Sequence, residues 1–122
     1  MATESPQISD GSQVTAAADL SAKQFYCVKL TAARAVNLSG AGDASYGILQ
    51  NKPISGEVCD VALFGISKAV AGAATTAGGP LMIDSSGRVI DKTSTNTVVA
   101  MGLEAATATG QIITVKIVPT AG

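Results

Sequence analysis

The sequence predicts an all-β fold, a small sandwich or barrel of about eight short strands with an extended N-terminal arm. From Phe25 onward, short runs of β-branched and aliphatic residues alternate with turns rich in Gly, Asn, Asp and Pro. No segment repeats its apolar residues with the period of an amphipathic helix. Hydrophobic residues make up 47% of the 122-residue chain but aromatic residues only 3%, so small aliphatic side chains must build the core of one domain.

Residues 1–22 differ in composition from the rest of the chain. Ser, Thr, Gln, Ala and Asp dominate there, and Ile8, Val14 and Leu20 are isolated apolar residues. The short alanine run at 16–18 is marginal as a helix. We therefore expect residues 1–22 to be an extended arm that is ordered where it lies on a partner, and residues 23–122 to be a β-rich domain. A frayed terminus is the alternative interpretation.

The first strands are expected at residues 25–30 and 35–38, before a loop with two glycines. In the first strand Tyr26, Val28 and Leu30 alternate onto one face. Gly40 and Gly42 form a G-x-G fragment in the loop, but Ser45 stands where a third glycine would be needed and no Gly-Lys-Ser/Thr follows. The pattern favours a turn over a phosphate-binding loop.

The most hydrophobic region is residues 47–70, which predicts a strand, a turn and a long strand. The turn is expected at Gln50, Asn51, Lys52 and Pro53. The long strand, residues 57–70, is apolar on both faces, with Cys59, Val61 and Leu63 on one and Ala62, Phe64 and Ile66 on the other. Either both faces are covered, or the strand shifts phase at a bulge near Gly65.

The C-terminal half predicts two hairpins after a small-residue loop at 69–79. Residues 81–83 and 88–90 flank a type I turn that begins at Asp84 and ends at Gly87. Residues 98–103 and 113–117 form the second pair of strands around a turn at 107–110, and Pro119 is expected to end the sheet.

The side chains do not suggest an enzyme, a cofactor or a metal centre. The chain has no histidine. Its carboxylates are scattered and lack the spacing of a calcium loop (Asp43, Glu57, Asp60, Asp84, Asp91 and Glu104). Cys27 and Cys59 fall within predicted strands, and we interpret them as buried reduced thiols, with a disulfide as the alternative.

The charge distribution excludes several classes of partner. The net charge is −1 without a basic run, so we expect no direct nucleic-acid binding. The apolar runs are shorter than the ~20 residues of a membrane helix, and the N-terminus lacks the pattern of a signal peptide.

Lys92 follows Asp91 between β segments, as in the modified turn of a lipoyl or biotinyl carrier domain, but its flanking residues do not extend that match. A solvent-facing lysine is the preferred interpretation.

Three segments, taken in order, resemble a known family. Residues 47–69, residues 77–88 with a D-x-x-G-R hairpin, and residues 102–115 with a closing hairpin are similar to the capsid cement or decoration proteins of tailed bacteriophages. The similarity covers residues 29–118, and residues 1–22 lie outside it. The resemblance implies a β-rich structural protein of the virion, made in the host cytoplasm, on the outer surface of the phage head.

The resemblance also implies partners. Such a protein forms a homo-oligomer, with a trimer favoured over a dimer, and bridges neighbouring subunits of the major capsid protein. We hypothesise that the arm and the central turn supply the capsid contacts, through Ile8, Val14, Leu20, Gln50, Asn51, Lys52 and Pro53. The alternative functions are a head-surface adhesin that contacts the host and, less favoured, the carrier domain modified at Lys92.

Overall fold

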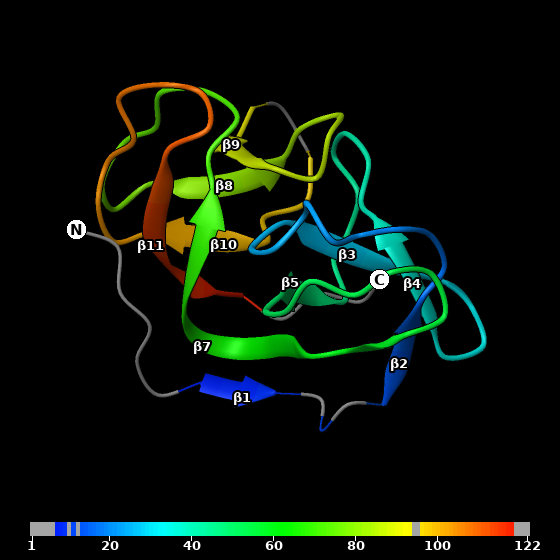
Figure 1. The fold of residues 1–122 in the computed structure, drawn as a ribbon. Helices are drawn as coiled ribbons and strands as arrows, with labels where there is room; N and C mark the ends of the chain where they lie inside the picture. Colours follow the sequence, from blue (N-terminus) through cyan, green and yellow to red (C-terminus); the bar gives the residue numbers. More distant parts are fainter. Residues whose placement is uncertain (1–6, 10, 12, 94–95, 119–122) are drawn as a thin grey trace.

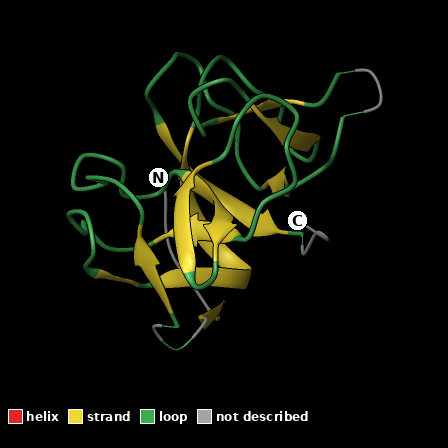
Figure 2. Cartoon of the chain, turned by 90° about the vertical axis from the view of Figure 1, so that its right-hand side faces the viewer, coloured by secondary structure: helices red, strands yellow, loops and turns green. Residues whose placement is uncertain are grey.

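The computed structural model describes residues 7–9, 11, 13–93 and 96–118, and it confirms the all-β prediction. Figure 2 shows strands gathered at the centre and loops at the periphery, without a helix in the described residues. The strands are β1 (Gln7–Ser9), β2 (Val14–Ala16), β3 (Cys27–Ala32), β4 (Ala35–Leu38), β5 (Gly47–Leu49), β6 (Val58–Cys59), β7 (Val61–Val70), β8 (Pro80–Ile83), β9 (Val89–Asp91), β10 (Ala100–Gly102) and β11 (Ile112–Ile117).

The strands belong to one sheet that closes on itself twice. The pairing order is β6-β2-β4-β3-β5-β7-β11-β10-β8-β9, and β1 pairs with β7 outside this path. Because only Asp60 separates β6 from β7, the first five pairings close into an N-terminal ring. Strand β9 is the last in this pairing order. A parallel bridge joins its residue Val89 to Ala71, just after the end of β7, and so closes a C-terminal ring. In Figure 1 the two rings lie on opposite sides of the molecule.

Strands β3, β5 and β7 form a wall between two hydrophobic cores. Cys27, Ile48 and Ala62 are neighbours in register and face the core of the C-terminal ring. The adjacent residues Val28, Leu49 and Val61 face the core of the N-terminal ring, because successive side chains of a strand point to opposite faces. At residues 61 and 62 both faces of the long strand are covered, as the first of the two sequence interpretations expected, whereas Phe64 further along is 45% exposed.

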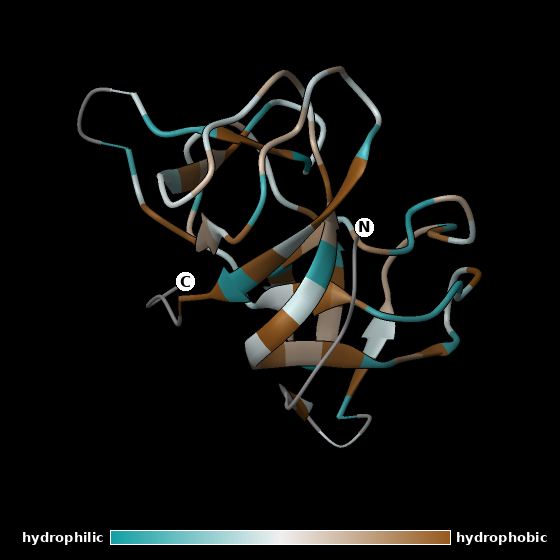
Figure 3. Ribbon diagram, turned by 90° about the vertical axis from the view of Figure 1, so that its left-hand side faces the viewer, coloured by the Kyte–Doolittle hydropathy of each residue, from teal (hydrophilic) through white to brown (hydrophobic). Residues whose placement is uncertain are grey.

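The N-terminal core is small and the C-terminal core is larger. Eight buried residues make up the first (Val14, Ala16, Leu20, Val28, Val36, Leu49, Cys59 and Val61). Sixteen make up the second, among them Leu81, Ile83, Val89, Ile113, Val115 and Ile117. Figure 3, viewed from the left-hand side of Figure 1, shows the apolar colour concentrated on the strands and the polar colour more frequent in the loops.

Strand β7 bends between its two halves, which run in different directions in Figure 1. Gly65 at the bend has a φ of 108°, a backbone conformation that other residues rarely adopt. The pairing of β1 with β7 shifts register between Ile8 and Ser9, because Ile8 is opposite Phe64 and Ser9 is opposite Ala62. This register shift agrees with the second sequence interpretation, a phase shift near Gly65, and the bend lets β7 take part in both rings.

The sequence predicts that residues 1–22 form an extended arm, but the structure places Val14, Ala16 and Leu20 in the N-terminal core. Val14 and Ala16 lie in β2 and are 3% exposed, and Leu20 is 2% exposed. Strand β1 pairs antiparallel with residues 62–65 of β7. Strand β2 pairs antiparallel with residues 58–59 of β6, so this segment follows the long strand of its own chain. Residues 1–6, 10 and 12 lie outside the described residues.

The predicted strands and hairpin turn agree with the structure in most places. Strand β4 has the predicted bounds, Ala35–Leu38. The turn after β8 is closed by a hydrogen bond from the Gly87 N–H to the Asp84 carbonyl (3.4 Å), as a type I turn requires. The Asp84 carboxylate also accepts hydrogen bonds from the backbone N–H and the Nε of Arg88. Pro119, expected to end the sheet, lies outside the described residues.

Candidate functional site

In three places the structure exposes large apolar side chains in groups, and Leu30 is exposed apart from them. We call them the edge patch (Ile8 and Phe64), the tip patch (Ile54, Glu57 and Val58) and the sheet patch (Met101, Leu103, Ile112 and Lys116). Their apolar members are between 39% and 53% exposed. Single exposed apolar residues are ordinary on a protein surface, but groups of them mark candidate interaction sites.

The edge patch joins the start of the chain to the middle of β7. Ile8 (52% exposed) lies directly opposite Phe64 (45% exposed), so the two side chains share a face. Ser9 of β1 is also exposed. Neither core includes Ile8 or Ser9, so these two exposed side chains of β1 are available to a partner. In Figure 1 strand β1 lies along the outer margin of the molecule, beside the first half of β7.

The tip patch lies on the loop that leads into β6. The Glu57 carboxylate accepts a hydrogen bond from the Ile54 N–H (2.8 Å), and the Glu57 N–H donates to the Ile54 carbonyl (3.0 Å). These two bonds make a compact turn between residues 54 and 57. Ile54 and Val58 are 53% and 50% exposed on either side of the carboxylate. The turn therefore holds an acidic group between two apolar side chains.

The sheet patch lies on the outer face of β10 and β11. Met101 is directly opposite Lys116, and the Leu103 N–H bonds to the Thr114 carbonyl (3.0 Å), so these side chains belong to neighbouring positions of one face. Ile112 shares the face two residues further along β11. The Thr114 N–H donates to the Glu104 carboxylate (2.8 Å), which is the main reason that the pKa of Glu104 is lowered.

Three of the residues predicted to contact the capsid are buried within the chain itself. Val14 and Leu20 belong to the N-terminal core. Pro53 is also buried, and its carbonyl accepts a hydrogen bond from the Leu20 N–H (2.9 Å). The prediction that these three residues form surface contacts is wrong, because packing against their own chain removes their side chains from the surface. Ile8 is exposed, as that prediction requires.

The polar residues of the central turn use their side chains to hold the turn together. Gln50 donates to the Ile48 carbonyl (3.0 Å) and to the Ser67 hydroxyl (2.9 Å). Asn51 donates to the Val58 carbonyl and accepts from the Asp60 N–H. These bonds engage both side chains within the chain, and the predicted capsid contact of Gln50 and Asn51 stays a prediction. Lys52 is exposed and stays a candidate contact.

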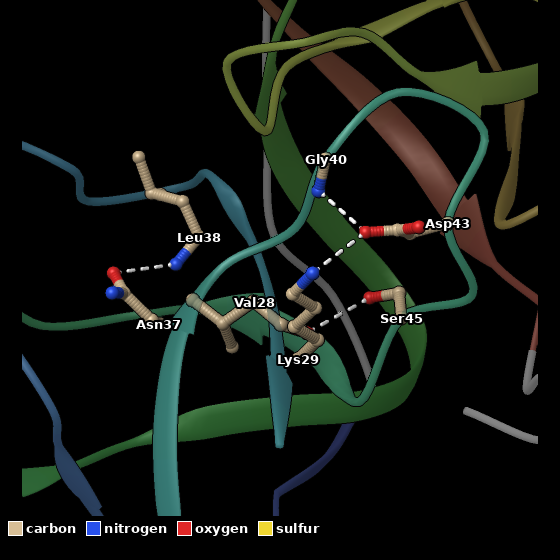
Figure 4. Close-up of polar contacts among 7 residues, drawn as sticks. All are labelled: Val28, Lys29, Asn37, Leu38, Gly40, Asp43 and Ser45. Carbon is tan, nitrogen blue, oxygen red and sulfur yellow. Dashed lines mark hydrogen bonds and ion pairs between the residues drawn. The ribbon is translucent and has the colours of Figure 1, made fainter. Parts of the chain in front are cut away.

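The glycine loop is a turn, as the sequence indicated. In Figure 4 the Asp43 carboxylate accepts hydrogen bonds from the Gly40 N–H (2.8 Å) and the Lys29 ammonium (2.9 Å). The Gly42 N–H donates to the Ile83 carbonyl. These backbone donors already have acceptors within the chain, so the loop does not offer them to a phosphate. The Lys29 and Gly40 hydrogen bonds are also the main reasons that the pKa of Asp43 is lowered.

Both cysteines are buried and neither forms a disulfide, which confirms the preferred interpretation of buried reduced thiols. Burial raises the pKa of Cys27 to about 12, so this thiol is protonated at neutral pH. In the part of the chain that the structure describes, there is no pocket and no group of three His, Cys, Asp or Glu residues arranged for a metal ion. Among the same residues, no helix has the length and apolar character needed to cross a bilayer.

Lys92 does not lie in a tight hairpin. Its N–H bonds to the Pro80 carbonyl (3.0 Å), which extends the pairing of β8 with β9. The next strand, β10, pairs with the other side of β8, so the chain after Lys92 crosses from one side of β8 to the other. This geometry differs from the hairpin turn that a carrier lysine occupies.

Comparison with solved structures identifies the class of fold. The crystal structure of the head fiber gp8.5 N base of bacteriophage phi29 is similar over 93% of this chain and 93% of that chain, with a TM-score of 0.68 and 15% sequence identity. At this identity the similarity shows a shared fold alone. A search of curated proteins found no match.

The family follows from the sequence. The family model described as phage cement protein matches residues 7–117, so the chain belongs to the phage cement protein family. It is a structural protein of the phage head, which is not an enzyme class, and its partner is the phage capsid. The match includes β1 and β2, which the resemblance noted from the sequence had left out.

Sequence reasoning missed most members of the three patches. Phe64, Met101 and Leu103 were placed in strands, but a strand pattern does not tell which apolar face remains exposed. A signal was present at residues 54–58, where Ile54 and Val58 flank a glycine-containing polar turn. Large apolar residues beside such a turn are candidates for a surface contact.

Proposed function

We propose that this protein binds the outer surface of the assembled phage head, bridges neighbouring major capsid subunits and thereby stabilises the lattice. Family membership supports a role in the head. The observation that carries the proposal is that exposed apolar side chains gather on three different parts of the fold: the β1–β7 pair, the turn at residues 54–58 and the β10–β11 pair. A bridging protein needs contact surfaces for the capsid and, where it acts as an oligomer, for other copies of itself, and three patches are enough for both kinds of contact.

The energetics of such a bridge do not require a strong single contact. A protein that binds only the assembled lattice stabilises that state by mass action. Attachment at one site raises the effective concentration of the remaining contacts, so overall affinity exceeds that of each contact. A homo-oligomer, with a trimer favoured, multiplies the number of attachment points in the same way.

We assign the capsid contact to the edge patch. Ile8 and Phe64 form an exposed cross-strand pair, and β1 contributes its described side chains to neither core. The backbone groups on the far side of an edge strand are available to pair with another chain. Lys52 is a second, separate candidate because it is exposed.

Heads that lack the protein test this assignment. The double variant Ile8→Ser and Phe64→Ser should fold normally and bind such heads at least about tenfold more weakly, since two half-exposed apolar side chains are lost. Leu30→Ser is the matched control, because Leu30 is 47% exposed but lies outside the three patches. Co-sedimentation with purified heads measures the binding. Equal binding by the double variant and the control would refute the edge assignment.

The same heads separate lattice stabilisation from adhesion to the host. Heads with the wild-type protein should resist heat and osmotic shock better than heads without it, as measured by release of packaged DNA. If both kinds of head are equally robust and only adsorption to cells differs, the adhesin alternative replaces the proposal.

A further inference from the structure

The tip patch carries an excess of negative charge. Ile54 and Val58 flank the Glu57 carboxylate. Asp60 adds a second carboxylate close by, because its N–H bonds to Asn51, whose side chain also bonds to the Val58 carbonyl. Lys52 is the one cation in this loop. The patch is therefore apolar at its centre and acidic in balance.

The sheet patch has a similar apolar centre with the opposite charge. Met101, Leu103 and Ile112 are 39%, 48% and 43% exposed. Lys116 is opposite Met101, and Lys68, whose ammonium lies 5.4 Å from the centre of the Phe25 ring, is opposite Thr114 on the same face of the sheet. Glu104 is the nearby carboxylate, and it is bonded to the Thr114 N–H. Two ammonium groups against one carboxylate make this face basic in balance.

We infer that the tip patch of one copy of the chain docks on the sheet patch of a second copy. Opposite charges around two apolar centres favour this pairing, whereas a contact of either patch with itself would bring like charges together. The patches lie on different rings, since Val58 of the tip patch lies in β6 of the N-terminal ring and β10 and β11 belong to the C-terminal ring.

The resulting contact is head-to-tail. Each copy takes part in two such contacts, one through its tip patch and one through its sheet patch. Such a heterologous contact generates a closed ring when the rotation between copies closes, as in a cyclic trimer. The inference rests on the proposed function and deepens it, because it names the surfaces through which the oligomer forms. The edge patch belongs to neither surface and is left for the capsid.

Mixing two defective variants tests the inference. Variant one carries Ile54→Ser and Val58→Ser, and variant two carries Met101→Ser and Leu103→Ser. Each variant alone lacks one partner surface and should be a monomer by sedimentation at micromolar concentration. Mixed together, they keep one intact tip patch and one intact sheet patch, so they should form a heterodimer that does not grow. The wild-type protein should form a larger closed oligomer.

Several outcomes would overturn the inference. A wild-type protein that stays monomeric, a variant that keeps the wild-type oligomeric state, or a mixture that stays monomeric would each do so. Circular dichroism and thermal unfolding confirm that the variants fold. If a capsid subunit covers these patches instead, the wild-type protein is a monomer while both variants bind heads weakly. That result removes the inference and leaves the proposed function intact.

A charge exchange tests the pairing without removing apolar side chains. Glu57→Lys and Lys116→Glu should each weaken self-association, by up to about fivefold for an exposed charge pair. The double variant restores opposite charges across a head-to-tail contact and should recover the wild-type affinity. A contact between identical patches would not be rescued in this way, so absence of rescue counts against the assignment.

Discussion

The N-terminal and C-terminal rings differ in how each completes its core. The C-terminal core has sixteen buried residues among those described, most of them from strands β7–β11. The N-terminal core has eight, and Val14, Ala16 and Leu20 come from the segment before the first predicted strand. The smaller core therefore depends on a segment whose composition resembles a flexible terminus. Both cores share the wall of β3, β5 and β7, so neither ring is a separate domain.

Deletion of residues 1–20 should destabilise the fold more than any other change considered for the two rings. The deletion removes β2 and Leu20, which leaves Cys59 and Val36 without their neighbours in the N-terminal core. We expect the truncated chain to be unfolded or molten by circular dichroism and proton NMR. Deletion of residues 1–9 is the control and should leave a folded protein, because β1 contributes no described side chain to either core. A folded 1–20 deletion would show that the ring does not need this segment.

Leucine truncation compares the two cores directly. Leu20→Ala in the N-terminal core and Leu81→Ala in the C-terminal core remove the same atoms from sites that are 2% and 0% exposed. Each should lower the free energy of unfolding by about 2–5 kcal/mol. Urea unfolding followed by circular dichroism and by NMR signals from each ring measures the loss. If the shared wall couples the cores, all probes give one transition; two transitions would show independent rings.

Substitution at the junction of the rings should have an intermediate effect. A Cβ on Gly47 would collide with the backbone carbonyl oxygen of Ala62, where β5 packs beside β7. The same Cβ would lie 2.6 Å from the Val61 side chain. Gly47→Ala should therefore cost about 1–3 kcal/mol by overpacking. Gly56→Ala is a useful contrast, since a Cβ there meets nothing within 4 Å and the cost comes only from its φ of 85°. Thermal unfolding of the two variants measures the difference.

The pair of Lys29 and Asp43 should give the smallest effect. The pKa of Asp43 is lowered from 3.8 by the Lys29 hydrogen bond and then by the Gly40 N–H. A lowered pKa in the folded state adds stability above the unfolded value, and this stability is lost as the pH falls below about 4. Since the two side chains are 42% and 38% exposed, the contribution is small and weakens with salt.

Carboxyl NMR titration checks this prediction. Lys29→Met should move the pKa of Asp43 back toward its ordinary value, while the Gly40 hydrogen bond keeps it from returning fully. An unchanged titration of Asp43 in this variant would show that the ion pair does not control the carboxylate.

The elements that could be predicted are those whose signals are local. Strand β4 lies between turn residues, and the hairpin after β8 carries Asp and Gly at the positions that its turn requires. Strands β1 and β2 have three residues each and form by pairing with residues 58–65, far along the chain. A local sequence pattern does not predict such a pairing. For the same reason Leu20 and Pro53, which meet through a backbone hydrogen bond, both looked like exposed residues.

The continuous course of residues 58–70 through both rings has a mechanical consequence. A pulling force applied between the edge of one ring and the face of the other travels along the peptide bonds of a single strand. Its antiparallel neighbours are then loaded in shear, so several ladder hydrogen bonds must break together rather than in succession. The molecule should therefore resist tension more strongly along this strand than across it.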